Sequence, residues 1–229
     1  MTSPHLNLSP PQALEFYETP RTFTRFLFSE LRALGHSIAG VVCEPTAGAG
    51  AILEGSASLG LTPPWSVDRW ICNDLDPSWR NEYQEDATDE AFWRTVGIGG
   101  RGIDWTVGNP PFTAAVDIIT HALRYSRVGV AMHLRATIHE VLKTGPQRTW
   151  MLEHPPSGIL WLPRFGYQRS TRTGKWSTDS VCACWVVWLK DVRAGQFIRY
   201  APPWVLDELK AETPVYRARM DELMERRAA

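Results

Sequence analysis

The chain has 229 residues, of which 44% are hydrophobic and 21% are charged, and this composition excludes disordered, collagen-like and disulfide-stapled proteins. Its length suits one domain with a sizeable core, residues 1–229. No apolar run approaches the roughly 20 residues that span a bilayer, no signal peptide is evident, and four cysteines indicate a reducing compartment. We therefore expect a cytoplasmic domain that has no membrane partner.

The formal net charge of −1 conceals an uneven distribution along the chain. Residues 1–120 carry 7 Lys and Arg against 15 Asp and Glu, whereas residues 121–229 carry 17 against 10. A basic half favours a polyanionic partner such as DNA or RNA. A chance imbalance on solvated faces gives the same numbers, so charge alone leaves both interpretations open.

The first helix is predicted after a polar tail. Residues 1–14 are rich in Ser, Pro and Asn and are typical of a flexible terminus. Thr19 followed by Pro20 predicts a helix start, with Thr19 as N-cap and Pro20 at the first helical position, and Gly35 predicts its end. Apolar residues at helical spacing form one stripe for burial: Phe23, Phe26, Leu27, Leu31 and Leu34.

Short apolar segments then alternate with helical ones. Strands are predicted at residues 38–43, 70–72, 105–107, 128–134, 159–162 and 181–189. Helices are predicted at residues 51–59, 114–125 and, as a charged C-terminal extension, 205–229. This alternation predicts an α/β fold with a mostly parallel, Rossmann-like sheet and helices on both faces. Ligands in such folds bind outside the carboxyl ends of the strands.

A glycine-rich turn, Glu44–Gly50, follows the first predicted strand. Its glycines, Gly48 and Gly50, let the backbone approach a ligand closely, and the acid at the strand end can accept hydrogen bonds from that ligand. The turn differs from the dinucleotide-binding fingerprint because a third glycine is missing. By itself it fits a structural turn as well as a binding site.

Acidic residues follow the second predicted strand. Asp74 lies where an acid can hold a ribose diol, although an acid that caps a helix N-terminus fits the same position. Asp86 is a candidate acceptor for an adenine amino group. Its acidic neighbours Glu85, Asp89 and Glu90 leave that assignment open.

The sharpest motif is Asn109-Pro110-Pro111-Phe112, which follows a buried strand. An Asn-Pro-Pro-aromatic string occurs by chance in about one chain in a thousand of this length. Prolines remove N–H donors and fix φ, so the Asn109 side-chain oxygen and the Pro110 carbonyl can accept both hydrogens of a planar amine. Phe112 can stack on the ring that carries the amine. The alternative is a tight surface turn with a core phenylalanine.

Together, these motifs resemble the S-adenosylmethionine-dependent amino-methyltransferases that modify exocyclic amines of nucleic-acid bases, and small phage-type DNA adenine-N6 methyltransferases in particular. Tyr17–Pro20 is similar to the upstream cofactor motif of one subgroup, and Thr178–Ser180 also looks like a feature of the phage enzymes. The resemblance covers roughly residues 15–190. It implies the class I methyltransferase fold, with S-adenosylmethionine as the cofactor.

The resemblance also implies roles for individual residues. The catalytic motif would consist of Asn109, Pro110, Pro111 and Phe112. The cofactor would be bound by Tyr17, Thr19, Pro20, Glu44, Thr46, Ala47, Gly48, Gly50, Asp74, Leu75, Asp86 and Asn109.

The chain has no room for a separate target-recognition domain, so recognition is expected from loops, chiefly residues 163–180. Cations interleaved with aromatic side chains suit phosphates and bases. In this loop they are Arg164, Tyr167, Arg169, Arg172, Lys175 and Trp176. A solvated loop with a few anchoring aromatic residues is the alternative.

The predicted function is methyl transfer to the N6 amine of adenine in DNA, with a flipped or single-stranded base held at Asn109–Phe112. Four alternatives stay open: N4 of cytosine, an RNA base, a protein glutamine amide, and a non-catalytic nucleic-acid-binding module of the same fold. No metal site is expected, because the cysteines and histidines show neither CxxC nor HExxH spacing.

Overall fold

The computed structural model describes residues 17–98, 102–139, 146–167, 169, 174–176 and 182–228. The predicted tail at residues 1–14, Arg172 and Thr178–Ser180 lie outside these residues, so the predictions about them stay predictions.

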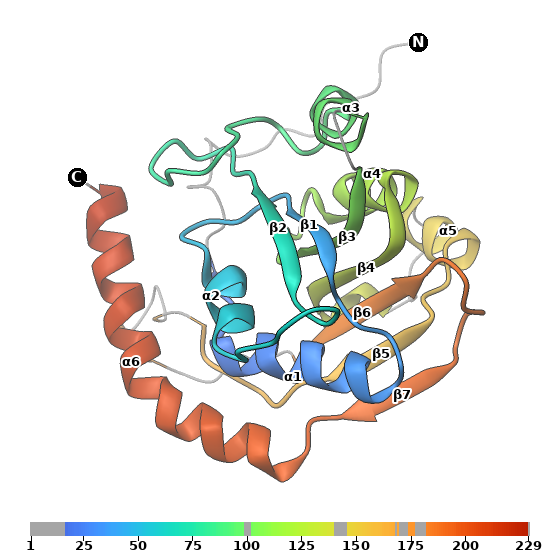
Figure 1. Cartoon of the computed structure of the whole chain (residues 1–229). Helices are drawn as coiled ribbons and strands as arrows, with labels where there is room; N and C mark the ends of the chain where they lie inside the picture. The colour runs from blue at the N-terminus through green and yellow to red at the C-terminus, as the bar shows by residue number, and fades with distance from the viewer. Residues whose placement is uncertain are drawn as a thin grey trace.

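A seven-stranded sheet forms the centre of the fold, in the order β2-β1-β3-β4-β6-β5-β7 (Figure 1). The strands are β1 Gly40–Glu44, β2 Val67–Cys72, β3 Ile103–Gly108, β4 Ser126–Arg135, β5 Gly158–Trp161, β6 Ala183–Leu189 and β7 Phe197–Tyr200. Strands β2, β1, β3 and β4 pair in parallel, β6 runs antiparallel to β4 and β5, and β7 pairs in parallel with β5. The predicted mostly parallel α/β sheet is confirmed.

Helices cover both faces of the sheet and build an apolar core on each. They are α1 Arg21–Ala33, α2 Ala51–Ala57, α3 Glu90–Ile98, α4 Ala115–Tyr125, α5 Pro146–Glu153 and α6 Pro203–Ala228, with a 3-10 turn at Ala136–His139. One core holds side chains of α1, α2 and α6, and the other holds side chains of α3 and α4. Successive side chains of strand β6 point into the two cores in turn. Trp185 and Val187 enter the first core, and Cys184 and Val186 enter the second.

Helix α1 ends where the sequence predicts. Gly35 adopts φ +85°, a left-handed conformation that glycine enters without a Cβ penalty. The N–H of Gly35 donates to the Arg32 carbonyl (3.0 Å), and the N–H of His36 donates to the Leu31 carbonyl (2.8 Å). These two bonds pair carbonyls that the helix itself leaves open. The apolar stripe is at most 1% exposed at Phe23, Phe26, Leu27 and Leu31.

The predicted start of α1 is wrong by one residue. Pro20 takes the N-cap position, and the helix begins at Arg21. Thr19 makes no capping bond; instead, the Glu212 carboxylate of α6 accepts hydrogen bonds from the N–H groups of Arg21 (2.7 Å) and Thr22 (2.9 Å). A negative charge at a helix N-terminus is stabilising, and in this helix it comes from the far end of the chain.

Helix α6 packs more deeply than a charged surface helix would. It begins at Pro203 and continues through Pro214 to Ala228. One side of it is buried against the first core, through Val205, Leu209, Tyr216 and Met220. The charged residues that dominate the sequence of α6 therefore occupy only the part of its surface that is not packed against the core.

Candidate functional site

The glycine-rich turn between β1 and α2 is held from two sides. Gly48 and Gly50 adopt φ +53° and φ +84°, conformations that favour glycine. The Asp74 carboxylate accepts a hydrogen bond from the N–H of Gly48 (2.7 Å), and the Asn81 side chain donates to the Gly48 carbonyl (3.1 Å). Residues that follow β2 thus fix the backbone of the turn that follows β1.

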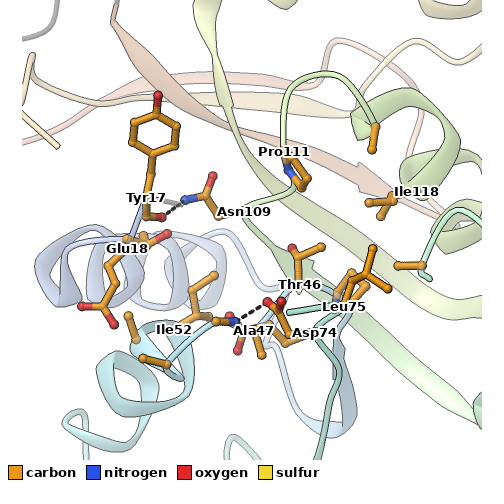
Figure 2. Close-up of a pocket in the computed structure, with 18 of the residues that line it drawn as sticks. Tyr17, Glu18, Thr46, Ala47, Ile52, Asp74, Leu75, Asn109, Pro111 and Ile118 are labelled. Atoms are coloured by element: carbon orange, nitrogen blue, oxygen red, sulfur yellow. Dashed lines mark hydrogen bonds between the residues drawn. The ribbon is translucent and has the colours of Figure 1, made fainter. Parts of the chain in front are cut away.

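A cavity of about 330 Å³ opens beside this turn, at the carboxyl ends of β1, β2 and β3 (Figure 2). The structure brings most of the predicted cofactor residues to its wall: Tyr17, Thr19, Glu44, Thr46, Ala47, Gly48, Asp74, Leu75, Asp86 and Asn109. Pro20 and Gly50 are not among the residues that line it. Each of them instead occupies the N-cap position of a helix, Pro20 in α1 and Gly50 in α2.

Buried polar atoms without a partner lie in the cavity wall. Among the described residues, the Oγ1 atoms of Thr19 and Thr46 and the Oε2 atom of Glu44 are buried and accept or donate no hydrogen bond. Burial raises the pKa of the Glu44 carboxyl well above its usual range, and the nearby Asp74 and Glu18 raise it further. An unpaired buried polar group is costly, so these atoms are suited to a polar, cationic ligand.

Asp74 has a structural role in addition to its place in the wall. One carboxylate oxygen accepts from Gly48 and the other from the N–H of Asp76 (2.9 Å). Burial raises the pKa of Asp74, and the backbone hydrogen bonds from Asp76 and Gly48 oppose that rise. Each carboxylate oxygen has a second lone pair, so Asp74 can hold the turn and still bind a hydroxyl.

The structure separates the acids that the sequence left ambiguous. Asp86 and Glu85 line the cavity, and the Asp86 carboxylate also accepts from the N–H of Thr88 (2.8 Å). Asp89 accepts from a backbone N–H in the first turn of α3 (2.9 Å). Glu90 forms ion pairs within and beside that helix. Asp89 and Glu90 therefore stabilise α3.

Asn109 lies between the cavity and a second, smaller recess. Its side-chain amide donates from Nδ2 to the Tyr17 carbonyl (2.8 Å), and its Oδ1 lies 3.3 Å from Nδ1 of His133. The recess, of about 20 Å³, is lined by Tyr17, Asn109, Phe112, His133, Arg135, Tyr167 and Ala183. Asn109 and Tyr17 thus border both hollows.

The Phe112 ring forms one wall of the recess. The Arg135 guanidinium lies over this ring, 4.6 Å from its centroid, and the Tyr17 ring lies 6.0 Å from it in a tilted arrangement. A flat, electron-rich ring of this kind also stacks on a nucleic-acid base. Pro111 faces the large cavity, so the motif Asn109–Phe112 contributes side chains to both hollows.

No protein-family model matches the chain, and no curated protein matches it in sequence. Solved structures do resemble it. A Listeria monocytogenes protein assigned to the class I S-adenosylmethionine-dependent methyltransferases aligns with a TM-score of 0.55 and 12% identity, over 87% of this chain and 71% of that one. A Vibrio vulnificus YJ016 protein assigned as the modification subunit of a type I restriction enzyme aligns with a TM-score of 0.54 and 12% identity, over 89% of this chain and 54% of that one.

The chain has the class I methyltransferase fold. It spans about half the length of the Vibrio protein.

None of the helices in the described ranges is both long and apolar enough to cross a membrane. No three His, Cys, Asp or Glu side chains in the same ranges are grouped so that they could hold a metal ion.

The predicted recognition loop contributes less exposed aromatic surface than its sequence suggests. Tyr167 is buried and lines the recess, and Trp176 packs half-buried against the first core. Arg169 is exposed but forms a two-pronged ion pair with Asp221 of α6 (2.8 and 2.7 Å). Arg164 and Lys175 are exposed. Tyr167 and Trp176 lose exposed surface because they pack against the core and anchor the loop to it.

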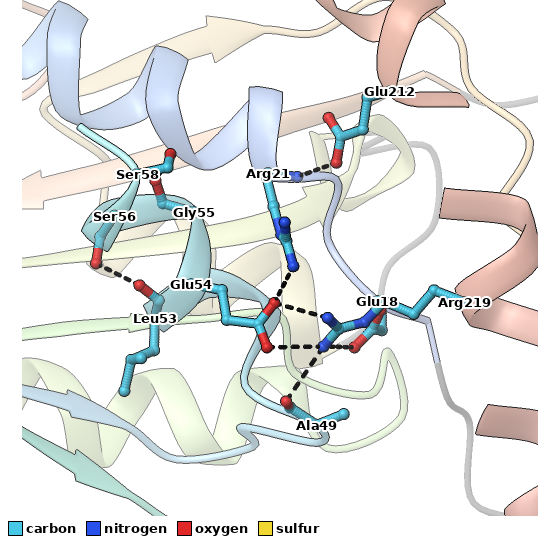
Figure 3. A network of polar contacts seen from close by, with 10 residues as sticks. All are labelled: Glu18, Arg21, Ala49, Leu53, Glu54, Gly55, Ser56, Ser58, Glu212 and Arg219. Carbon is cyan, nitrogen blue, oxygen red and sulfur yellow. Dashed lines mark hydrogen bonds and ion pairs between the residues drawn. The ribbon is translucent and has the colours of Figure 1, made fainter. Parts of the chain in front are cut away.

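Arg219 of α6 joins the segment before α1 to helix α2 (Figure 3). Its guanidinium donates to the Glu18 carboxylate (2.8 Å) and to the Glu54 carboxylate of α2 (2.7 Å). Glu18 lines the cavity and its side chain is only 3% exposed. Burial raises the pKa of Glu18, and the Arg219 guanidinium opposes that rise.

Replacing Arg219 with methionine is expected to lower the free energy of unfolding by about 2 kcal/mol at neutral pH, because the buried Glu18 carboxylate loses its partner. The pKa of Glu18 then rises further above its usual value. The folded state would hold a proton that the unfolded state has lost, so the deficit should grow as the pH rises from about 4.5. Urea unfolding at several pH values measures this.

The matched control for Arg219→Met is Arg226→Met on the same helix. Arg226 pairs with Glu222 at the surface, where both side chains are more than 60% exposed, and such pairs contribute about 0.5 kcal/mol or less. An Arg219→Met variant as stable as the Arg226→Met variant at every pH would contradict the prediction.

Sequence reasoning missed three residues of the site. Glu18 was passed over within the Tyr17–Pro20 motif, although an acid beside a ligand motif was a usable signal. His133 and Arg135 are not among the predicted site residues, although both line the recess. Both lie at the carboxyl end of β4, where ligand-binding residues of parallel sheets gather, and that position was the available signal.

Proposed function

We propose that the chain is an S-adenosylmethionine-dependent methyltransferase that modifies an exocyclic amine of a nucleic-acid base, with N6 of adenine in DNA as its substrate. The observation that carries this proposal is the position of Asn109 between two hollows. One hollow is acidic and large enough for a nucleoside-type cofactor, and the other is small, aromatic and adjacent.

The residues of the large cavity fit the cofactor. Its wall carries the buried Glu44 carboxylate and the two unpartnered threonine hydroxyls, which suit an ammonium group and a carboxylate of an amino acid moiety. Asp74 suits a ribose diol, and Asp86 at the rim suits an adenine amine. Five acids line this cavity, Glu18 and Glu85 included, and they complement a ligand with a net positive charge.

The cofactor, when bound, supplies a methyl group activated by a sulfonium. The chain's own residues hold the acceptor amine toward it: the Asn109 Oδ1 and the Pro110 carbonyl accept the amine hydrogens, and Phe112 stacks on the base. The cofactor would give up the methyl group and leave as a neutral thioether, and the proton of the methylated amine would pass to solvent after the transfer. The contribution of the protein is positioning and exclusion of water, with no strong base required.

Three observations support nucleic acid as the partner. Residues 121–229 carry 17 Lys and Arg against 10 Asp and Glu. Arg164 and Lys175 are exposed, and they belong to the same stretch of sequence as Tyr167, which lines the recess. One structure of the same fold is assigned as a modification subunit of a restriction enzyme. The Phe112 ring supplies a stacking surface that a protein amide would not need.

The purified chain is expected to transfer labelled methyl from S-adenosylmethionine to DNA, and not to total RNA or to a protein extract. Digestion of the labelled DNA should yield N6-methyldeoxyadenosine. Label in RNA or protein instead would contradict the proposed DNA substrate but would still support the proposed methyl-transfer reaction. The absence of both transfer and cofactor binding would contradict the proposed enzyme and favour a non-catalytic module.

A further inference from the structure

A series of linked hydrogen bonds runs through the side chain of Asn109, part-buried at Asn109 and buried at its far end. The Asn109 Nδ2 lies 2.8 Å from the Tyr17 carbonyl oxygen, and its Oδ1 lies 3.3 Å from His133 Nδ1. The other ring nitrogen, His133 Nε2, lies 3.1 Å from the Tyr167 hydroxyl. The side chains come from three segments: the turn after β3, strand β4 and the segment after β5.

The chemistry of the end groups fixes the direction of every bond in this chain. The Tyr17 carbonyl can only accept, so the amide nitrogen of Asn109 faces it and the amide oxygen faces His133. Because that oxygen also only accepts, Nδ1 of His133 must carry the ring hydrogen. Nε2 is then the acceptor, and the Tyr167 hydroxyl donates to it.

The surroundings of His133 keep it in this one form. His133 is 4% exposed, with Trp185 at 5.2 Å and Tyr167 at 5.6 Å between ring centroids. Burial among aromatic rings lowers the pKa of His133 to about 3. A neutral imidazole has a single N–H, and in this series of hydrogen bonds the N–H of His133 points at Asn109.

We propose that His133 and Tyr167 are positioning residues that hold the Asn109 amide with its oxygen toward the substrate recess. This inference rests on the proposed function, because it assigns that oxygen to the acceptor amine. An amide oxygen accepts two hydrogen bonds. His133 occupies one of these positions, and Asn109 borders the recess, so the other is available for a substrate N–H.

The two bonds on opposite edges of the amide together fix its plane. The Tyr17 bond alone would leave the oxygen edge able to swing about the side-chain torsion of Asn109, which is broad for amides. Because His133 also bonds to the oxygen edge, the Asn109 amide oxygen is already oriented before the substrate binds. Tyr167 in turn donates to Nε2 of the tautomer that the Asn109 oxygen requires and holds the imidazole ring in place, so it acts on Asn109 through an intermediate residue.

Replacing Tyr167 with phenylalanine is expected to lower the turnover number about tenfold while the affinity for S-adenosylmethionine changes less than about twofold. The matched control is Tyr216→Phe, which removes another buried tyrosine hydroxyl; among the described residues, that hydroxyl bonds to the backbone carbonyls of Glu18 and Tyr167 and to no side chain. Both variants should lose similar thermal stability, but only Tyr167→Phe should lose turnover. Equal turnover in the two variants would overturn the proposal.

A second measurement does not depend on activity. Nitrogen-15 imidazole spectra of the full chain, with the His133 signals assigned by their loss in His133→Gln, should show the Nδ1–H tautomer at neutral pH. The Nε2–H tautomer, or a mixture of the two in the unsubstituted chain, would overturn the proposal whatever the substrate is. A chain that shows the expected tautomer and methylates no nucleic acid would contradict the proposed function and leave the hydrogen-bond order intact.

Discussion

Replacing Asn109 with alanine is expected to slow methyl transfer by about 10²- to 10³-fold. The reason is that, in the proposed reaction, the amide oxygen accepts a hydrogen of the substrate amine and aligns the nitrogen lone pair, and alanine offers no acceptor at that position between the two hollows. Affinity for the cofactor should change less than about fivefold, because the acidic wall around Glu44 and Asp74 stays in place. Single-turnover rates and equilibrium binding separate the two effects.

Asn81→Ala provides the contrast to Asn109→Ala. The Asn81 side chain donates to the Gly48 carbonyl and supports the glycine-rich turn, so its loss should raise the KM for the cofactor and leave the rate at saturation unchanged. Unimpaired turnover by Asn109→Ala would contradict the catalytic role assigned to Asn109. A thermal melt identifies any variant whose loss comes from unfolding, because the Tyr17 carbonyl also loses its partner in Asn109→Ala.

Replacing Glu44 with glutamine is expected to weaken cofactor binding about 10- to 100-fold at neutral pH, the effect of losing one charge-assisted hydrogen bond. Glu44 is 2% exposed, and its Oε2 has no partner among the described residues. A bound ammonium group would pair with that oxygen. Calorimetric titration with S-adenosylhomocysteine measures the loss without turnover.

The same carboxyl predicts a pH dependence in the unsubstituted chain. Burial, with Asp74 and Glu18 close by, raises the pKa of Glu44 well above its usual range, so the empty site holds a proton that a free carboxyl would have lost. A bound cation favours the ionised form and releases that proton. Affinity should therefore rise with pH through the raised pKa, by at most about tenfold per pH unit for this one group.

Glu44→Gln should remove this pH dependence, because an amide does not ionise. Glu82→Gln is the matched control: its carboxylate forms an exposed ion pair with Arg69, and the variant should follow the unsubstituted chain at every pH. Titrations in buffers of different ionisation enthalpy count the protons released. Binding without proton release by the unsubstituted chain would contradict the assigned role of Glu44.

Much of the fold near the site was predictable from local patterns. The apolar segments that end at Glu44, Asp74 and Asn109 predicted strands, and parallel strands bring their carboxyl ends to one edge. The predicted cofactor residues that come from these ends do line one cavity. Their roles in binding stay predictions until the variants above are measured.

Elements with weak patterns were not predicted. In β7 only Phe197 is buried, so the segment shows no alternation for a strand prediction to use. At the start of α3, Asp89 and Glu90 are the acidic neighbours that left the assignment of Asp86 open, and in the structure they stabilise the helix that begins there. Short elements of this kind form because neighbouring strands and helices offer them a surface to pack on.

The sequence by itself determined the order of the elements and the motifs at the strand ends, because burial periodicity and turn chemistry act between residues that are near neighbours. Only the tertiary structure decided which side chains meet. Arg219 bonds Glu18 across 201 positions, and His133 reaches Asn109 across 24. Spacing cannot reveal such pairs, since they depend on how α6 packs against the cavity wall and how β4 lies beside β3.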